Sequence, residues 1–228
     1  MSNSAAPLIV HHLNHSRSAR ILWLLEELEV PYEIKFYKRG ADKRAPKELR
    51  DIHPLGKSPV ITHGDVTVAE SGAIIEYIIR KFGNGKCRPP ASGEVDDLYF
   101  SHYAEGSLMP LVVNKFIYSL VPGQVPFYIR PLVSMVTGLL DAQLCNPGLR
   151  NHIKLIEGHL AKKGDWFAGG EGPTSADFVM CYGVEGLASF FPDEVGPNTK
   201  AWIERVHNRP AYKRALEKGG PDSDGHPE

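Results

Sequence analysis

The amino-terminal part of this chain carries a strand, a helix and a second strand in close succession. Residues 8–12 form a short apolar run that predicts a strand, and residues 32–37 alternate as a second strand does. Between them, residues 18–29 place apolar side chains at helical spacing (Ile21, Leu24, Leu25 and Leu28), and Pro31 ends the pattern. This succession predicts a βαβ unit, whose strands lie parallel and are joined by a right-handed crossover.

A hairpin and a further helix follow that unit. Residues 59–62 and 66–69 have strand character and flank residues 63–65, HGD, a turn of hairpin length. Glu70 and Ser71 then open a helix that extends to residue 82, with isoleucines on its core-facing side. The order βαβ then ββα predicts a four-stranded mixed sheet with helices packed on it.

The character of the chain changes at residues 83–94, GNGKCRPPASGE, which read as a linker. No strand pattern follows it, so we expect an α/β domain over residues 1–82, a linker over 83–94 and an all-helical bundle domain over 95–218. The predicted helices of the second domain are 96–113, 130–144, 149–163, 175–190 and 199–218. Residues 219–228, GGPDSDGHPE, have nothing to bury and predict a disordered tail.

Composition excludes several classes of protein. A formal net charge of -1 provides no global field for nucleic acid or an anionic membrane. The start MSNSAAP lacks a basic, apolar secretory signal, and charges interrupt every long apolar stretch, so we expect no membrane-spanning segment. The three cysteines are far apart and form neither a CxxC pair nor a metal-ligand pattern, which favours reduced thiols in the cytoplasm and no metal.

Four ordered motifs give the chain a family resemblance. They are residues 12–28, HLNHSRSARILWLLEEL, residues 53–60, HPLGKSPV, residues 69–77, AESGAIIEY, and residues 172–177, GPTSAD. Together with the βαβ–ββα order and the helical second domain, they resemble the cytosolic glutathione transferase superfamily, in particular its fungal and bacterial serine-type members. The resemblance covers residues 8 to about 218 and implies a thioredoxin-like first domain that holds glutathione as the co-substrate, with no covalently bound cofactor.

Ser16 lies just ahead of the first predicted helix. Glutathione chemistry needs a thiolate, and a hydroxyl donor near a helix N-terminus lowers the pKa of a bound thiol. Taken alone, such a serine is more often an N-cap residue. The family resemblance favours the catalytic role over the capping role and implies that the Ser16 hydroxyl donates to the glutathione sulfur.

Asn14 and His15 lie in the same turn. Some related proteins use an asparagine amide, so Asn14 is an alternative catalytic residue and His15 a further candidate for contact with glutathione. The turn holds neither cysteine nor tyrosine. This argues against the subgroup that forms a mixed disulfide with glutathione and against the tyrosine-dependent classes.

Two dipeptides are candidates for binding the tripeptide. The resemblance implies a cis bond between Ser58 and Pro59, which presents the Ser58 backbone to the cysteinyl part of glutathione like an added strand; otherwise this proline simply begins a strand. Ser71, at a positive helix end, is suited to the γ-glutamyl carboxylate, and Glu70 to the γ-glutamyl ammonium. The simpler interpretation is an N-cap serine beside a solvated glutamate.

The glycyl carboxylate of glutathione requires a cation at the other end of the tripeptide. Lys43 and Lys57 are the candidates, although most surface lysines are simply solvated. In the second domain, Tyr103 and Ser107 lie on the helix that the resemblance assigns to the hydrophobic co-substrate pocket. An aromatic residue at helical spacing is more often part of a core.

Thr174 and Asp177 have the spacing of a capping box. We expect this box to be a folding feature, and loss of Asp177 to cost about 1 kcal/mol or more from the cap alone.

The function predicted is therefore a glutathione transferase that activates glutathione as a thiolate for hydrophobic electrophiles, peroxides or both. The resemblance also implies a homodimer. Two alternatives stay open: a non-catalytic binder of glutathione or apolar ligands, because fold alone does not confer activity, and a glutathione-dependent disulfide reductase.

Overall fold

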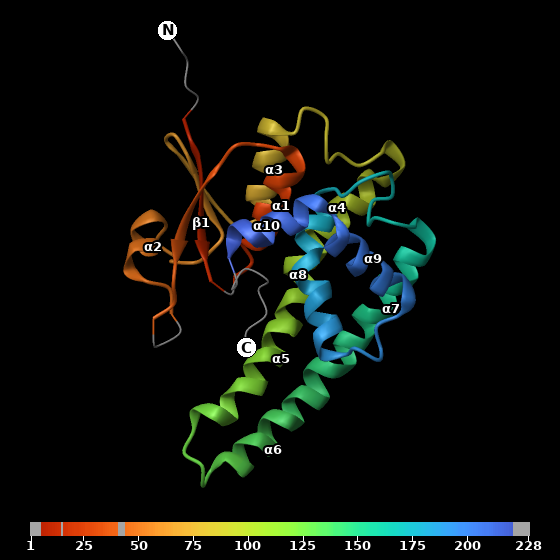
Figure 1. The fold of residues 1–228 in the computed structure, drawn as a ribbon. Coiled ribbons are helices and arrows are strands. Elements are labelled where there is room, and N and C mark those ends of the chain that lie inside the picture. Colours follow the sequence, from red (N-terminus) through yellow and green to blue (C-terminus); the bar gives the residue numbers. More distant parts are fainter. Residues whose placement is uncertain (1–5, 15, 41–43, 221–228) are drawn as a thin grey trace.

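The computed structural model describes residues 6–14, 16–40 and 44–220, and its first domain has the predicted order of elements (Figure 1). The elements are β1 (Leu8–Leu13), α1 (Ala19–Leu28), β2 (Glu33–Tyr37), α2 (Lys47–Ile52), β3 (Val60–His63), β4 (Val66–Ala69) and α3 (Ser71–Phe82). The predicted βαβ–ββα order is confirmed, with α2 as an addition between β2 and β3.

The four strands form one mixed sheet in the order β2-β1-β3-β4. Strand β1 is parallel to β2, with Val10 opposite Ile34, and antiparallel to β3, which pairs antiparallel with β4. Helices α1 and α3 cover the face toward the second domain, and α2 lies on the opposite face (Figure 1). Successive strand residues face opposite sides of a sheet, so Val10 is buried in the main core while Leu13 is buried on the α2 side.

The short helix α2 has little amphipathic pattern to reveal it. Its sequence KELRDI offers Leu49 as its one fully buried side chain, which packs with Leu13 and Tyr37 in a small separate core. A helix of six residues is set by such tertiary contacts and not by periodicity.

The second domain is helical. Its elements are α4 (Glu94–Tyr103), α5 (Met109–Leu120), α6 (Arg130–Leu140), α7 (Asn146–Lys163), α8 (Ser175–Phe190), α9 (Pro197–Asn208) and α10 (Pro210–Gly219). Near the end of the predicted linker, Ala91–Gly93 form a 3-10 turn, and the last residue of that linker, Glu94, is the first residue of α4. The part of the predicted tail from residue 221 onward lies outside the described residues.

Four of the predicted helices need correction. The helix expected to end at residue 113 continues to Leu120, through a wide π-helical turn at Ala104–Leu108 that joins α4 to α5. A second such turn, Asp141–Cys145, joins α6 to α7, so two separately predicted helices run together. The predicted helix 199–218 is two helices, because Pro210 forces the preceding Arg209 into an extended conformation (ψ 131°).

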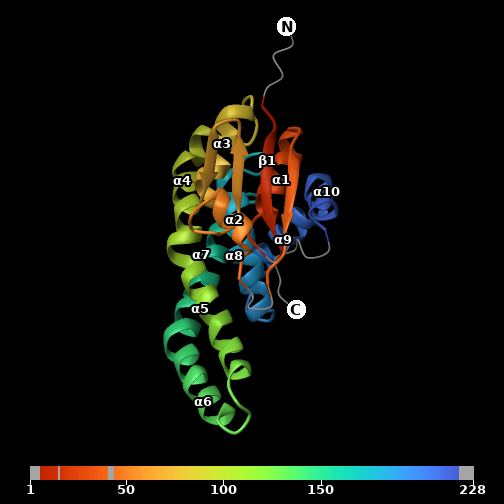
Figure 2. The same cartoon turned by 90° about the vertical axis from the view of Figure 1, so that its left-hand side faces the viewer.

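The two domains share one hydrophobic core around Trp23 of α1. Its indole packs edge-on against Phe178 of α8, with ring centroids 4.5 Å apart, and against Tyr212 of α10 at 5.7 Å. Ion pairs reinforce this contact at its rim, where Glu27 of α1 binds Arg209. Away from this contact, the α5–α6 hairpin projects from the body of the molecule (Figure 2). In the described part of the chain, no helix combines the length and apolar character needed to cross a membrane.

Candidate functional site

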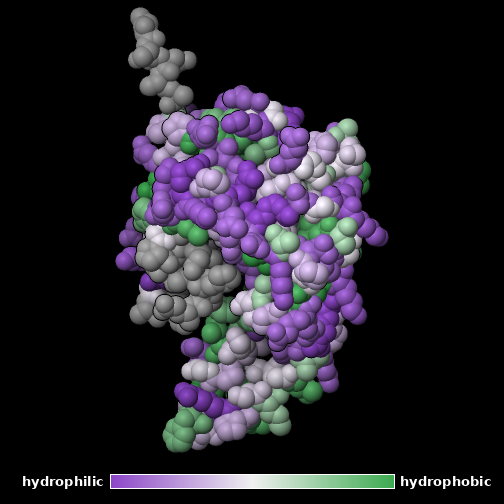
Figure 3. All heavy atoms as spheres, turned by 45° about the vertical axis from the view of Figure 1, so that its right-hand side comes forward, coloured by the Kyte–Doolittle hydropathy of each residue, from purple (hydrophilic) through white to green (hydrophobic). Residues whose placement is uncertain are grey.

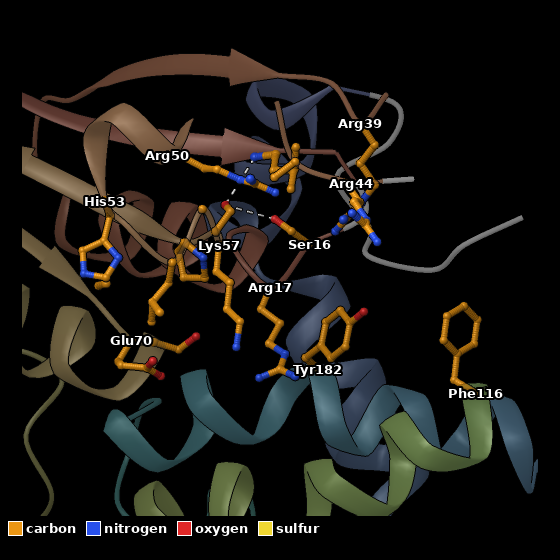
Figure 4. A pocket seen from close by; sticks show the side chains of 18 residues that line it. Ser16, Arg17, Arg39, Arg44, Arg50, His53, Lys57, Glu70, Phe116 and Tyr182 are labelled. Atoms are coloured by element: carbon orange, nitrogen blue, oxygen red, sulfur yellow. Dashed lines mark hydrogen bonds between the residues drawn. The ribbon is translucent and has the colours of Figure 1, made fainter. Parts of the chain in front are cut away.

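A cavity of about 560 Å³ lies where the first domain meets the second. The β1–α1 turn, the β2–α2 loop, the α2–β3 loop and the start of α3 line one side, and α5 and α8 line the other. The lining residues are Leu13, Ser16, Arg17, Arg39, Arg44, Ala45, Arg50, His53, Leu55, Gly56, Lys57, Ser58, Pro59, Ala69, Glu70, Ser71, Phe116 and Tyr182. Figure 4 shows Ser16 in the middle of this cavity, between Glu70 and Phe116.

Ser16 is held by two other serines. Its Oγ lies 2.6 Å from the Ser18 Oγ and donates to the Ser58 Oγ at 3.2 Å. The backbone N–H of Ser18 also points at the Ser16 Oγ, at 3.4 Å. The residue is almost fully buried but lines the cavity. Its hydroxyl therefore lies at the N-terminal end of α1, where positive partial charge from backbone N–H groups favours an anion.

Asn14 has a different position. Its Oδ1 accepts a hydrogen bond from the backbone N–H of Arg39 at 2.9 Å, and its own N–H donates to the carbonyl of Tyr37. Asn14 is not among the residues that line the cavity. Its amide ties the β1–α1 turn to the loop after β2. His15 lies outside the described residues.

The Ser58–Pro59 peptide bond is cis, as the resemblance implied. The Ser58 hydroxyl donates to the carbonyl of His11 at 2.9 Å, and the backbone N–H of Leu13 donates to it in turn at 3.3 Å. These bonds fasten the loop that precedes β3 to the end of β1. Both Ser58 and Pro59 line the cavity.

Glu70 and Ser71 lie at the N-terminus of α3. Ser71 is the first residue of the helix and is buried, and both residues line the cavity. Glu70 has a φ of 72°, a conformation that costs a non-glycine residue about 1–3 kcal/mol. Such strain tends to persist at ligand sites, where the surrounding structure determines the backbone. This backbone conformation places the Glu70 carboxylate beside the positive N-terminal end of α3.

Basic residues dominate the charged lining of the cavity. Lys57 is the sequence-predicted one, and Lys43 lies outside the described residues. Four arginines were not predicted: Arg17, Arg39, Arg44 and Arg50. Arg39, Arg44 and Arg50 belong to a stretch dense in basic residues, positions 38 to 50, and this pattern is equally typical of a solvated loop. Arg17 lies outside that stretch, next to Ser16. Against five basic side chains, Glu70 is the one acidic residue in the described lining.

The structure does not bring Tyr103 and Ser107 to this cavity. Tyr103 is buried in the core, where it packs against Phe100 and shares a hydrogen bond with the Nδ1 of His152. Ser107 is exposed on the wide turn between α4 and α5. Phe116 and Tyr182 supply the aromatic lining instead (Figure 4).

Tyr182 is close to several arginines. Burial raises the pKa of its phenol, and the positive charges of Arg17 and Arg20 act in the opposite direction. The guanidinium of Arg20 lies over the Tyr182 ring, 5.6 Å from its centroid. Among the described residues, no group of three or more His, Cys, Asp or Glu side chains could hold a metal ion.

Comparison with known proteins places this chain in a family. Residues 8–80 match the model of the glutathione S-transferase N-terminal domain, and residues 139–219 match that of the C-terminal domain. Glutathione S-transferase 3 of Schizosaccharomyces pombe is 37% identical over 92% of this chain and 87% of its own length. Glutathione S-transferase 1 of Saccharomyces cerevisiae is 33% identical over 93% of this chain and 95% of its own.

Solved structures agree with this placement. A glutathione S-transferase from Actinobacillus pleuropneumoniae superposes with a TM-score of 0.72 and 27% identity, over 97% of both chains. A Phanerochaete chrysosporium glutathione transferase, solved with oxidized glutathione, shares the fold with a TM-score of 0.73 at 17% identity, over 96% of this chain and 97% of its own. The chain belongs to the glutathione transferase family.

Proposed function

We propose that this member of the family is an active glutathione transferase that binds glutathione in the cavity and holds its sulfur as a thiolate at the Ser16 hydroxyl. The observation that carries the proposal is the position of Ser16. It is a hydroxyl donor that lines the cavity at the N-terminal end of α1. Such a donor favours the charged form of a thiol, because a hydrogen bond to the thiolate lowers its pKa.

The lining residues suit the charges of the tripeptide. We assign the γ-glutamyl ammonium to Glu70 and the γ-glutamyl carboxylate to Ser71 at the start of α3. The backbone of Ser58 is suited to the cysteinyl part, and Lys57 to the glycyl carboxylate. The preference for Ser16 over Asn14 rests on the Asn14 side chain being engaged with the Arg39 backbone.

The electrophile would enter on the side of the helical domain. Phe116 of α5 and Tyr182 of α8 present aromatic surface there (Figure 4). Aromatic and other apolar walls are typical of sites for small organic molecules, and this side of the cavity offers such a wall opposite its charged side. Hydrophobic electrophiles and organic peroxides are therefore the substrate classes proposed.

The cysteines of the chain do not support a mechanism through its own thiol. None of the three lines the cavity. Burial raises the pKa of Cys87 to about 12 and also raises that of Cys145 and Cys181. A protonated, buried thiol is a poor nucleophile. Free cysteines also fit the reducing cytoplasm, which we propose as the location.

We further propose a homodimer. The α5–α6 hairpin exposes apolar side chains, several of which colour the lower part of the molecular surface green in Figure 3. They include Ile117, Leu120, Phe127, Tyr128, Leu132, Met135, Val136 and Leu139. An apolar surface of this kind favours association. Light scattering is expected to give twice the chain mass of 25.2 kDa; a single chain mass would contradict the dimer.

Steady-state assays with an aromatic electrophile and with cumene hydroperoxide test the function. We expect turnover in the wild type and, in Ser16→Ala, a loss of about a hundredfold in kcat, as for the removal of one key donor. Glutathione affinity should change by less than about twofold, because most of the contacts proposed here are made by the carboxylates and the ammonium of glutathione and not by its sulfur.

Asn14→Ala is the matched comparison, since it removes a polar side chain from the same turn. Collapse of activity in Asn14→Ala with full activity in Ser16→Ala would move the catalytic role to Asn14. Tight glutathione binding without turnover of either substrate would contradict the enzyme and leave a binding protein.

A further inference from the structure

A chain of hydrogen bonds leads from Ser16 into the protein interior. The Ser16 Oγ lies 2.6 Å from the Ser18 Oγ, and the Ser18 Oγ lies 2.9 Å from the Nδ1 of His12. The exposed fractions are 6% for Ser16, 0% for Ser18 and 2% for His12. The three polar groups are therefore shielded from solvent along the whole chain, except where Ser16 meets the cavity.

The direction of these bonds follows from counting protons. Each hydroxyl has one proton to donate. The Ser58 hydroxyl donates to the His11 carbonyl, and the Ser16 hydroxyl donates to Ser58. Ser16 can therefore only accept from Ser18, and Ser18 can only accept from the Nδ1–H of His12. The same direction holds when the Ser16 proton turns to a sulfur atom in the cavity.

Ser18 is not engaged in capping the helix. It occupies the N-cap position of α1, and its carbonyl accepts from the backbone of Ile21 and Leu22. Its side chain makes no capping hydrogen bond, although serine is a preferred cap. The local structure of α1 thus leaves the Ser18 hydroxyl to the chain between His12 and Ser16.

We propose that His12 and Ser18 are positioning residues that strengthen Ser16 as a donor to the glutathione thiolate; this inference rests on the proposed function. In this series of hydrogen bonds, His12 donates to Ser18, Ser18 donates to Ser16, and Ser16 can donate to the sulfur of bound glutathione. Hydrogen bonds in series polarise one another, and they do so more strongly in an interior without water. A more polarised Ser16 hydroxyl stabilises the thiolate and disfavours the thiol. These hydrogen bonds transfer no proton, since the proton of the glutathione thiol leaves to solvent.

A matched control exists on the same strand. The neighbouring His11 points to the opposite face of the sheet, where its Nδ1 bonds the Tyr37 hydroxyl at 2.9 Å. Tyr37 and Ser18 are thus both buried hydroxyls bonded to the Nδ1 of a histidine of β1, and only Ser18 contacts Ser16. Tyr37→Phe and Ser18→Ala remove comparable bonds with different expected effects.

The test is the pKa of the bound glutathione thiol, titrated by the ultraviolet absorbance of the thiolate in the complex. Ser18→Ala and His12→Leu should each raise it by about 0.5–1 unit and lower kcat/KM about threefold to tenfold below that pKa. The dissociation constant of glutathione should stay within about twofold of the wild-type value, because the hydrogen bonds from His12 and Ser18 affect the ionisation of the thiol and not the contacts of the rest of glutathione. Tyr37→Phe should titrate like the wild type.

Two conservative variants keep the test decisive. His12→Asn retains an N–H donor near the Nδ1 position and should restore most of the wild-type value. Ser18→Cys keeps the volume with a weaker donor and should shift the thiol pKa in the same direction as Ser18→Ala, should the alanine variant fail to fold. An unchanged thiol pKa in folded Ser18 and His12 variants would overturn the proposal. If the wild-type complex itself shows no lowered pKa, the proposed function has failed instead.

Discussion

Arg20 of α1 donates from Nη1 to the Oε1 of Glu105 at 2.7 Å, and the two residues belong to different domains. The Arg20 side chain is almost completely buried, and Arg17 binds the other carboxylate oxygen of Glu105. Glu105 therefore joins the first turn of α1, and with it the Ser16 turn, to the helical domain.

Replacing Glu105 by glutamine should destabilise the protein, because a buried guanidinium would lose its counter-ion. We expect the free energy of unfolding in urea to fall by about 2–3 kcal/mol, less than for a fully buried pair since Glu105 is partly exposed. The control is Glu76→Gln, which breaks an exposed pair with Arg80 within α3 and should cost at most about 0.5 kcal/mol. Equal losses in the two variants would contradict the role of Glu105.

Asp177 is fully buried and accepts several hydrogen bonds. The backbone N–H groups of Thr174 and Phe167 donate to it at 2.9 and 3.1 Å, and the Trp202 indole donates at 2.9 Å. The capping box is confirmed, but the carboxylate also fastens two further segments. We expect Asp177→Ala to cost about 3–5 kcal/mol in urea unfolding, well above the cap alone. A loss near 1 kcal/mol would reduce its role to the cap.

Gly93 precedes α4 at a close contact between backbones. A Cβ at this position would lie 1.9 Å from the carbonyl oxygen of Ala168. Gly93→Ala should lower the free energy of unfolding by about 2–3 kcal/mol, since the backbone must move. Gly158→Ala, within α7 and with open space around its Cβ position, should raise it by about 0.5–1 kcal/mol. Thermal and urea unfolding of both variants check the two signs.

The lowered pKa of His11 predicts that the stability of the protein depends on pH. Burial, and then the charge of Lys35, lowers its pKa below the ordinary value of 6.5. The unfolded chain therefore binds a proton more readily than the native state, and stability falls as the pH drops through about 6.5. Between pH 7.5 and 5.5, His11→Gln should therefore lose less of its free energy of unfolding than the wild type does. Parallel urea titrations check this, and identical losses would contradict it.

The first domain could be predicted because its signals are local. Apolar periodicity defines α1 and α3, and strand alternation defines β2. Helix α2 could not be found in this way, because a buried contact of Leu49 defines it. The extension of α5 to Leu120 and the wide turn before it depend on tertiary packing, which periodicity does not encode.

In the candidate site, too, the residues that stand in local motifs could be predicted and those placed by tertiary packing could not. Ser58, Pro59, Glu70 and Ser71 stand in short motifs, and the structure brings them to one cavity with Ser16. Tyr103 lies on the helix that the family resemblance assigns to the co-substrate pocket, but its side chain is buried in the core. Tyr182, which lines the cavity from α8, is more than a hundred residues from the motifs around Ser58 and Glu70. No local pattern marks such a residue.

The bound glutathione thiol tests the central claim most directly, because its pKa measures how strongly this protein favours the thiolate. A free thiol has a pKa of about 8.5. In the wild-type complex, the thiolate absorbance should titrate more than one unit lower. In the Ser16→Ala complex, with glutathione still bound, it should return to within about half a unit of the free value. A wild-type value equal to that of free glutathione, or a lowered value that survives Ser16→Ala, would contradict the account.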